Sequence, residues 1–429
     1  MGREIINVGI LGCGNVGSGT IKVLQDNQEA ISRKIGATLC IKRVAVAHLE
    51  KQRPEWVDRA VLTDRPGEVL DDPEIDIVAE TIGGMQPAKA YLLRAMENGK
   101  QIVTANKELL AKEGGDILPV AAKLGLDCFF EGAVAGGIPI IRPLKVDLAA
   151  NRIDRIEGIV NGTTNYILTQ MAQHGREFDD VLAEAQKLGY AEVDPTDDID
   201  GHDAMYKLAI LASIAFSARI PISDVYFEGI RNVSSADIHF AQELNYVIKL
   251  LAIAKRTGDR IELRVHPAFV PKRHPLASVD GAFNALFLHG DAVGDVMFYG
   301  RGAGSMPTGS AVAGDIIDIA RNIRTGSTAR ISCGCHGEIA AMPMTDVVTR
   351  YYVRMQVEDR PKVLAAVAGV FGDFEVSIAS VVQREAHEGI ADIVWLTHPA
   401  IEKNIDDAMT KIRTLDAVRA IHNRIRVED

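Results

Sequence analysis

One segment combines two charged side chains with a long apolar surface. Asp203 and Lys207 stand four residues apart, so a helix over residues 201–217 would place both on one face. From Ala204 to Phe216, Lys207 is the only formally charged residue. A helix that is apolar nearly all round is buried, and a buried ammonium must be paired or face a polar cavity. An exposed ion pair is the ordinary alternative, which the apolar neighbours oppose, so Lys207 is a candidate functional lysine with Asp203 as its partner.

Two metal-binding alternatives fail on spacing. If Gly201 were the sixth position of a calcium-binding EF-hand loop, Thr196 and Lys207 would stand where that loop needs Asp and Glu. A short CGCH segment carries possible zinc ligands, but no second pair follows at zinc spacing. Its residues are Cys333, Cys335 and His336.

A glycine-rich turn near the start of the chain is typical of dinucleotide binding. Gly12, Gly14 and Gly17 have the G-x-G-x-x-G spacing, with Asn15 and Val16 between them. The turn follows an apolar strand and opens a helix, which is the context that gives this spacing meaning. The first glycine permits a tight turn, the second lets a pyrophosphate approach the backbone, and the third permits close packing of helix on strand.

The end of the second expected strand leaves the choice between NAD and NADP open. An acidic residue there would bind the ribose of NAD, but Ala47 and His48 occupy that place. Glu50 follows two residues later, and then Lys51 and Arg53. The two cations favour a cofactor with a 2′-phosphate, although NAD remains an alternative.

A second lysine follows a strand. Asn106 and Lys107 come directly after the expected strand Gln101–Thr104, at the carboxyl end where parallel sheets bind ligands. Lysines in such positions are usually solvated, so this position alone is a weak indication.

The elements that must position these residues fall into three regions. In the first, short apolar runs alternate with helical patterns, which predicts a Rossmann-type, doubly wound parallel sheet in an α/β fold. Its strands are expected at 5–11, 41–47, 75–79, 101–104 and 126–130, with helices at 16–25 and 87–98.

The middle region mixes long helical patterns with strand patterns, which predicts an α+β domain. Helices are expected at 162–174, 179–188, 201–217 and 236–256, and strands at 152–160, 259–270 and 284–289. A glycine-rich turn at 299–309 then opens a helix at 310–321.

The last region has the order βαββαβ, the ferredoxin-like pattern. Its elements are expected at 351–357, 362–371, 376–383, 391–396, 405–415 and 418–427. We therefore expect domains at 1–132, with the helix at 305–321 packing back on it, and at 133–325, then a linker at 326–347 and a last domain at 348–429. This last domain should be separable by truncation near Thr345.

Composition excludes several classes of protein. With 47 basic and 58 acidic side chains the formal charge is −11, which argues against a nucleic-acid binder. No segment is long and apolar enough to predict a membrane helix, and no signal peptide is recognisable. Five cysteines in 429 residues do not make a disulfide framework, so we expect a cytoplasmic protein.

Taken together, these motifs resemble homoserine dehydrogenase over about residues 5–325. The segments that carry the resemblance keep the family's order. They are GILGCGNVGSG, ETIGG (80–84), VTANKELLA (103–111), EGAVAGGIPII (131–141), NGTTNYIL (161–168), LGYAEVDPTDDIDGHDAMYKLAIL (188–211) and YGRGAG (299–304). The resemblance implies NAD(P)-dependent interconversion of L-homoserine and L-aspartate 4-semialdehyde, in threonine, methionine and isoleucine biosynthesis.

The resemblance also implies roles for individual residues. Lys207 and Lys107 would be the active-site lysines, with Lys207 as proton donor, and a carboxylate-poised lysine suits that step chemically. Glu192 and Asp203 match substrate-binding carboxylates, and Asp198 a further acidic position. Cofactor contacts would come from the glycine turn, Thr81, Lys107, Gly189 and Gly302. Backbone carbonyls would hold a monovalent cation, Na⁺ or K⁺, at Glu131, Val134, Gly136 and Ile138. His48 and Arg301 depart from the family's usual residues.

The last 80 or so residues resemble an ACT domain through the turn Asp359–Arg360–Pro361 before an apolar helix. Such domains pair edge to edge and bind small amino acids, so the resemblance implies L-threonine as effector and a homodimer or homotetramer. Two alternatives are an ACT-bearing Rossmann dehydrogenase for a different acid and a non-catalytic amino-acid or nucleotide sensor. The segment at 188–211 opposes the first, and the two lysines with their carboxylates oppose the second.

Overall fold

The computed structural model describes residues 4–331, 334–335, 337–384 and 388–428, so Cys333 and His336 of the zinc alternative lie outside the described residues. The chain divides into two compact units, each built from separate stretches of sequence. The first comprises Met1–Ile156, Tyr206–Ser223 and Asn284–Ile339, and the second Glu157–Met205, Asp224–Phe283 and Ala340–Asp429. Each unit is described by itself below.

The first unit contains a six-stranded sheet in the order β3-β2-β1-β4-β5-β6, and every neighbouring pair is parallel. The strand at 126–130 is reduced to two residues, and the second strand begins and ends earlier than expected. The strands are β1 (Ile5–Leu11), β2 (Thr38–Ala45), β3 (Leu62–Thr63), β4 (Ile77–Glu80), β5 (Gln101–Thr104) and β6 (Cys128–Phe129).

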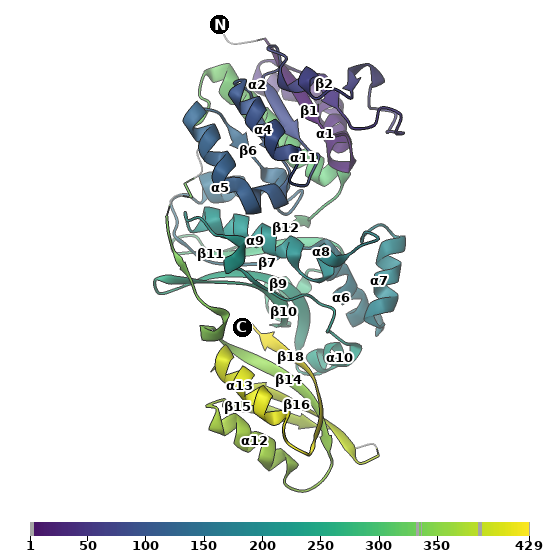
Figure 1. Ribbon diagram of the computed structural model, residues 1–429, viewed down its shortest axis with the longest axis vertical. Helices are drawn as coiled ribbons and strands as arrows, with labels where there is room; N and C mark the ends of the chain where they lie inside the picture. Colours follow the sequence, from purple (N-terminus) through teal and green to yellow (C-terminus); the bar gives the residue numbers. More distant parts are fainter. Residues whose placement is uncertain (1–3, 332–333, 336, 385–387, 429) are drawn as a thin grey trace. The chain divides into compact units, whose positions relative to one another are not determined.

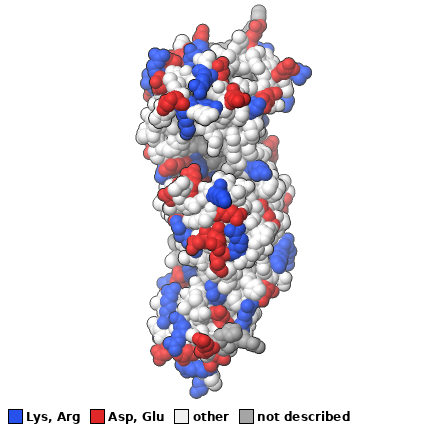
Figure 2. Space-filling model, turned by 90° about the vertical axis from the view of Figure 1, so that its right-hand side faces the viewer, with Lys and Arg blue, Asp and Glu red and all other residues white. Residues whose placement is uncertain are grey.

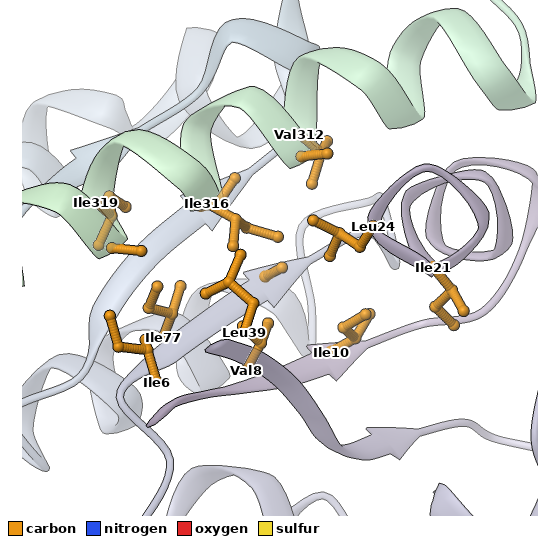
Figure 3. Packing of buried hydrophobic residues seen from close by; sticks show 14 of the residues in the cluster. Ile6, Val8, Ile10, Ile21, Leu24, Leu39, Ile77, Val312, Ile316 and Ile319 are labelled. Carbon is orange, nitrogen blue, oxygen red and sulfur yellow. The ribbon is translucent and has the colours of Figure 1, made fainter. Parts of the chain in front are cut away.

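Helices cover both faces of this sheet, which confirms the doubly wound fold (Figure 1). Ile6, Val8 and Ile10 of β1 pack on one face against α1 and α11, as Figure 3 shows. Val78 and Ile102 pack on the other face against α4 and α5. The helices are α1 (Asn15–Asp26), α2 (Gln28–Ile35), α3 (Gly67–Leu70), α4 (Ala88–Glu97), α5 (Lys107–Leu124) and α11 (Ser305–Thr325).

Helix α11 is therefore part of this doubly wound fold, although it lies far away in sequence. Val312, Ile316 and Ile319 are fully buried and point onto the sheet (Figure 3). The glycines of α1 and α11 permit a close approach, because a Cβ on Gly19 would lie 2.0 Å from the Ser305 carbonyl oxygen. The first unit also contains β12 (Gly294–Arg301) and the short helical segments η2 (Glu131–Ala133) and η3 (Pro143–Asp147). Strand β11 (Phe283–Gly290) belongs to it as well, except for its first residue, Phe283.

The second unit is built on a mixed sheet in the order β7-β9-β10-β18-β14-β16-β15. Strand β7 (Ile153–Ile159) begins in the first unit and ends in the second, and helix α9 (His202–Ala215) begins in the second and ends in the first. The other elements before residue 280 are α6 (Gly162–His174), α7 (Phe178–Lys187), α8 (Thr196–Ile199), β8 (Tyr226–Phe227), α10 (Ser235–Glu243), β9 (Tyr246–Thr257) and β10 (Arg260–Pro271).

The helix expected at 236–256 is wrong beyond its first turns. Helix α10 ends at Glu243, Asn245 adopts a left-handed φ of 63°, and the chain continues as β9. Strand β9 pairs with β10 along its whole length in an antiparallel ladder. Its run of apolar residues is buried, and periodicity alone does not distinguish such a run from a buried helix.

The last region has the expected βαββαβ order. It consists of β14 (Val348–Glu358), α12 (Val363–Asp373), β15 (Ile378–Gln383), β16 (Ile390–Thr397), α13 (Glu402–Ile412) and β18 (Val418–Val427), with a short β17 (Ala400–Ile401). Within the expected linker, β13 (Ala340–Ala341) pairs with β10. Short helical turns lie at η1 (Arg59–Val61), η4 (Ile222–Asp224), η5 (Pro275–Ser278) and η6 (Met344–Asp346).

The last region, which the sequence analysis expects to be separable, packs closely on the rest of the second unit. Strand β18 pairs in parallel with β10, joining Ala268 to Arg426 in register. The fully buried Asp237 of α10 accepts hydrogen bonds from Arg354 at 2.7 Å and from the Tyr352 hydroxyl at 3.0 Å. A buried carboxylate depends on such partners. Residues 348–429 are therefore packed into the second unit and are not merely attached to it by a linker.

The surface carries charges of both signs. On the face that Figure 2 shows, Lys and Arg are interspersed with Asp and Glu. Among the described residues, no helix is long and apolar enough to span a membrane.

Candidate functional site

Of the three glycines in the turn, one has room for a side chain and two do not. Gly12 has a φ of +95°, and a Cβ there would lie 2.9 Å from the Thr81 carbonyl group. A Cβ on Gly17 would lie 2.3 Å from the Gly12 carbonyl oxygen, so α1 packs directly on the turn. A Cβ on Gly14 would meet nothing within 4 Å. The protein's own packing therefore requires Gly12 and Gly17, whereas Gly14 leaves space at the N-terminus of α1, where phosphates bind well.

The neighbouring strand end is held by a buried carboxylate that the sequence analysis missed. Glu80, fully buried at the end of β4, accepts the N–H groups of Ile82 at 2.7 Å and Gly83 at 3.0 Å. It also accepts the Thr104 hydroxyl at 2.6 Å, which ties β4 to β5. Thr81 donates its hydroxyl to the carbonyls of Leu11 and Gly12, at 3.1 and 3.0 Å. Thr81 thus holds the glycine turn and is available to a ligand only as an acceptor.

Arg53 lies beside the glycine turn. Its guanidinium donates to the backbone carbonyls of His48 at 2.7 Å and Lys51 at 2.9 Å, closing the loop after β2. It also lowers the pKa of the Cys13 thiol, although burial raises that pKa by more, so that the net direction is upward. The buried Nε of Arg53 has no hydrogen-bond partner among the described residues. The loop therefore carries a half-buried cation with one unsatisfied N–H, at the place where Rossmann folds select the ribose.

Lys107 is the first residue of α5 and half-buried. The side chain of Asn106 caps this helix by accepting the Leu109 N–H at 3.1 Å, and it donates to the Gly84 carbonyl at 2.7 Å. Asn106 is buried, so its two bonds fix the start of α5 against the turn after β4. A cation at a helix N-terminus faces the positive end of the helix dipole, a placement that an anionic ligand would stabilise.

Asn161 joins two of the predicted carboxylates. Its side-chain NH₂ donates to Asp198 Oδ1 at 2.7 Å and to Asp203 Oδ2 at 2.9 Å. Its carbonyl oxygen accepts the Thr164 N–H at 2.8 Å and so caps α6. Asn161 is 4% exposed and Asp203 is 3% exposed. One buried amide group therefore both caps α6 and donates to two carboxylates. Asn161 belongs to the NGTTNYIL segment, but no spacing in the sequence marks it as a site residue.

Helix α9 has the burial expected from its composition. Leu208, Leu211 and Ala212 are fully buried, and Lys207 is 8% exposed. Asp203 lies one turn before Lys207 on the same helix. The helix therefore holds a lysine and a carboxylate in register among apolar side chains, as the pattern predicted.

Other predicted residues are on the surface. Glu192 is exposed, and Gln186 donates to its backbone carbonyl at 3.1 Å. The contacts of the described residues do not join the Glu192 carboxylate to Asp198 or Asp203. Gly189 is exposed with a φ of +77° after α7, and Tyr190 accepts the Thr163 hydroxyl through its backbone carbonyl at 2.7 Å.

The predicted cation loop follows β6 and is buried. The carboxylate of Glu131 accepts the N–H groups of Ile141 and Arg142, each at 2.8 Å, so its side chain shapes the loop. Ala135 and Gly136 both adopt left-handed φ values, of 55° and 53°. The Glu131 N–H donates to Asp315 at 2.8 Å, and burial together with Glu131 raises the pKa of the Asp315 carboxyl well above its usual range.

Asn284 is a buried polar side chain at the edge of this loop. It is fully buried, and neither its Nδ2 nor its Oδ1 has a hydrogen-bond partner among the described residues. Its amide lies against Gly302, where a Cβ would lie 1.9 Å from Nδ2. A Cβ on Gly136 would in turn lie 2.4 Å from the Gly302 carbonyl oxygen. An unsatisfied buried amide costs about 1–3 kcal/mol, so this spot is suited to a group that the described residues do not supply.

Side-chain metal clusters are absent from the described part of the chain, where His, Cys, Asp and Glu form no group of three. A cation site made of backbone carbonyls would contain no such group of side chains.

Comparison with protein families finds three matches along the chain. The model described as the NAD binding domain of homoserine dehydrogenase matches residues 12–131. The model described as homoserine dehydrogenase matches residues 139–317, and the ACT domain model matches residues 351–417.

Curated relatives and solved structures agree with these matches. The homoserine dehydrogenase of Bacillus subtilis is 41% identical, and the match covers 99% of this chain and 99% of that protein. The homoserine dehydrogenase of Neisseria gonorrhoeae is 44% identical, and the match covers 99% of this chain and 98% of that protein. The crystal structure of a homoserine dehydrogenase from Thiobacillus denitrificans is 46% identical with a TM-score of 0.95, covering 100% of this chain and 99% of that one. A hyperthermophilic archaeal homoserine dehydrogenase solved in complex with NADPH is 27% identical with a TM-score of 0.62. The match covers 73% of this chain and 97% of that one.

Proposed function

The chain belongs to the homoserine dehydrogenase family and has its NAD(P)-dependent activity and an ACT domain, and on this premise we propose roles for its residues. The observation that carries the proposal is Asn161, which joins Asp198 to Asp203, one turn before the buried Lys207 on α9. The reaction converts L-aspartate 4-semialdehyde and NAD(P)H, with one proton, into L-homoserine and NAD(P)⁺.

Lys207 supplies the proton in this proposal. NAD(P)H delivers hydride to the aldehyde carbon, and the aldehyde oxygen then needs a proton. Lys207 lies among apolar side chains with Asp203 one turn away, and a lysine so placed suits the role of general acid. Lys107, at the positive end of α5, polarises the carbonyl as negative charge grows on oxygen.

Asp198 and Asp203 bind the ammonium of the amino acid. Asn161 donates one N–H to each carboxylate, so it orients the remaining oxygens without neutralising either charge. Glu192 belongs to the same proposal on the family resemblance alone.

The cofactor contacts follow from the glycine turn. Gly14, Asn15 and Val16 bind the pyrophosphate at the N-terminus of α1, while Gly12 and Gly17 shape the turn. Thr81, Lys107, Gly189 and Gly302 complete the set by resemblance. We propose a preference for NADP, because Arg53 lies beside Cys13 with an unsatisfied Nε and suits a 2′-phosphate.

A monovalent cation, Na⁺ or K⁺, also belongs to the proposal. The carbonyls of Glu131, Val134, Gly136 and Ile138 would hold it. The unsatisfied Asn284 near Gly136 supports a bound group there, and the cation would stabilise the loop that contacts Gly302.

The broader proposals concern assembly and control. We propose a homodimer or homotetramer in the cytoplasm, with L-threonine as effector of the ACT domain. The domain limits stay as predicted, at 1–132, 133–325, 326–347 and 348–429, with the helix at 305–321 assigned to the first.

One assay tests the core of the proposal. Dinucleotide reduction is measured with L-homoserine for the intact chain, with NAD and NADP side by side, and compared with Asn161→Ala and Lys207→Ala. We expect turnover with homoserine, a higher kcat/KM for NADP, and a loss of activity in both variants. If kcat/KM with NADP were more than about 100-fold below that with NAD, equivalent to about 2.7 kcal/mol, the role of Arg53 would be wrong while the activity would stand.

A further inference from the structure

Helices α5 and α9 enclose a cavity that the proposed function does not use. It has a volume of about 460 Å³ and lies entirely within the first unit. This volume falls within the range of about 300–1,000 Å³ that is typical of small-molecule sites. Its walls are mostly apolar and come from both helices and the segment after α9; they include Leu110, Leu118, Ile210, Ile214, Ile220 and Ile222.

The sequence keeps this cavity open with residues that disfavour a helix. Gly114, Gly115 and Pro119 all lie inside α5 and line the cavity. An interior glycine costs about 1 kcal/mol relative to alanine, and proline about 3 kcal/mol. Packing does not require glycine at 114, because a Cβ there would meet only Leu118 Cδ1 at 3.9 Å and Leu110 Cβ at 4.0 Å. The missing side chain at 114 therefore creates space and does not relieve a clash.

A guanidinium lies at the wall of this cavity. Arg219 is exposed and rests on Gly115, where a Cβ would lie 2.2 Å from its Cζ. Its side chain has no hydrogen bond or ion pair within the part of the chain that the structure describes. Lys112, the other cation in the lining, forms an ion pair with Glu108, with 2.5 Å between Nζ and Oε1. Its Nζ also lies 5.2 Å from the centre of the Tyr206 ring. Arg219 is thus the cation available for an acidic ligand.

We propose that this cavity binds a small carboxylate with an apolar body, whose carboxylate pairs with Arg219. The planar guanidinium offers two parallel donors to a carboxylate, and the apolar walls accept a branched hydrocarbon chain. Helix α5 begins at Lys107, and α9 carries Lys207, so a ligand wedged between them alters the arrangement of both lysines. A ligand that binds one arrangement better than another changes turnover. This effect on turnover rests on the proposed function, whereas the binding itself does not.

Calorimetric titration of the full chain tests the binding. The probes are 4-methylpentanoate, L-leucine and 4-methylpentan-1-ol, which share one carbon skeleton. We expect 4-methylpentanoate to bind at one site per chain, and the uncharged alcohol to bind at least about tenfold more weakly. L-leucine separates the two sources of such a carboxylate: tighter binding than 4-methylpentanoate identifies an amino acid, and weaker binding a simple organic acid.

Two variants locate the site. Gly114→Leu fills the cavity, and Arg219→Gln removes the charge from an exposed position where folding is little affected. Each should weaken 4-methylpentanoate binding by at least about tenfold. Lys123→Gln, which removes an exposed cation from α5 outside the cavity, should leave binding unchanged. In the wild type 4-methylpentanoate should change kcat, and in Gly114→Leu it should not.

Three results would overturn the proposal. One is the absence of binding by either carboxylate at about 10 mM, a concentration that reveals even millimolar affinity. Another is binding that persists in both variants, which would place the ligand elsewhere, such as at the substrate carboxylates or the ACT domain. The third is equal affinity for the alcohol, which would remove Arg219 from the site.

Discussion

The glycine turn and the carboxylate cluster depend on different kinds of interaction. The turn at Gly12–Gly17 is shaped largely by close backbone packing, and the hydroxyl groups of Thr81, Ser18 and Ser305 donate to its backbone carbonyls. The cluster around Asn161 is shaped by side chains, with one amide serving Asp198 and Asp203. The turn comes from neighbouring residues, whereas the cluster joins residues from two separate segments. The two sites should therefore respond to different kinds of substitution.

Deleting residues 346–429 should have the largest effect, and it should fall on the unit that carries Asn161. Asp237 would lose Arg354, Tyr352 and Asn423. An uncompensated buried charge costs about 3–5 kcal/mol, a large part of the 5–15 kcal/mol that stabilises a typical domain. We expect little soluble protein and no turnover, measured by soluble yield and thermal unfolding. A soluble truncated protein with normal homoserine oxidation would restore the separable domain expected from sequence.

Lys207→Ala should lower kcat by about 10²–10⁴, the typical contribution of a positioned general acid. The dinucleotide Kd should stay unchanged, because the glycine turn does not depend on this side chain. Steady-state kinetics and fluorescence titration of the cofactor measure the two effects. Lys123→Ala, on the exposed end of α5, serves as control, and a Lys207→Ala protein with near-normal turnover would end the assignment.

Asn161→Ala should raise the KM for homoserine by about tenfold to a hundredfold, since each lost hydrogen bond to a charged group is worth about 1.5–3 kcal/mol. The dinucleotide Kd should again be unchanged. Loss of the α6 cap should also reduce stability by about 1 kcal/mol. Asn161→Ser separates the two roles, because serine can cap the helix but cannot reach both carboxylates. A loss of cofactor affinity in these variants would contradict the division between the two sites.

Gly14→Ala and Gly17→Ala should differ from each other. A Cβ at 14 meets nothing within 4 Å, so this variant should keep its thermal stability while its dinucleotide Kd rises by about tenfold, or about 1.4 kcal/mol. A Cβ at 17 lies 2.3 Å from the Gly12 carbonyl oxygen, so the second variant should lose stability as well as affinity. Thermal unfolding and cofactor titration distinguish them, and identical behaviour would show that the open position is no ligand site.

The smallest effect concerns pH. His266 is fully buried; its Nδ1 lies 2.9 Å from the Pro267 carbonyl and its Nε2 2.7 Å from Arg264. These partners require a neutral ring, and burial together with Arg426 and Arg264 holds the pKa of His266 well below its usual value of 6.5. Because this pKa is depressed in the folded state, the unfolded chain takes up the proton first as pH falls.

This histidine therefore stabilises the fold above about pH 6.5, and that contribution decreases below it by at most about 1.4 kcal/mol per pH unit. We expect the drop in Tm between pH 7 and pH 5.5 to be smaller in His266→Gln than in the wild type. An equal drop in both proteins would assign the acid sensitivity to other groups.

Features carried by adjacent residues were predictable from the sequence. The glycine turn, the lone lysine of a buried helix and the βαββαβ order each have a short-range pattern. The helix expected at 236–256 failed because β9 is a strand buried on both faces, and its apolar run has no period that distinguishes it from a helix.

Features that join distant residues were not predictable. Glu80 bonds to Thr104 across two strands, and Asn161 bonds to Asp198 and Asp203 on other segments. Asp237 is paired with Arg354, from the other side of the expected linker. Such pairs depend on the fold for their proximity, and a single sequence carries no spacing that announces them.

The pairing of β18 with β10 has a consequence for the growing polypeptide. Ribosomes release Ala268 long before Arg426, its neighbour in the finished sheet. In that interval the edge of β10 is open along these residues, and an open edge is a template for pairing with another chain. Slow translation or crowding by sister chains would therefore promote aggregation at this edge, and a chaperone that shields it until β18 arrives would raise the yield of folded enzyme.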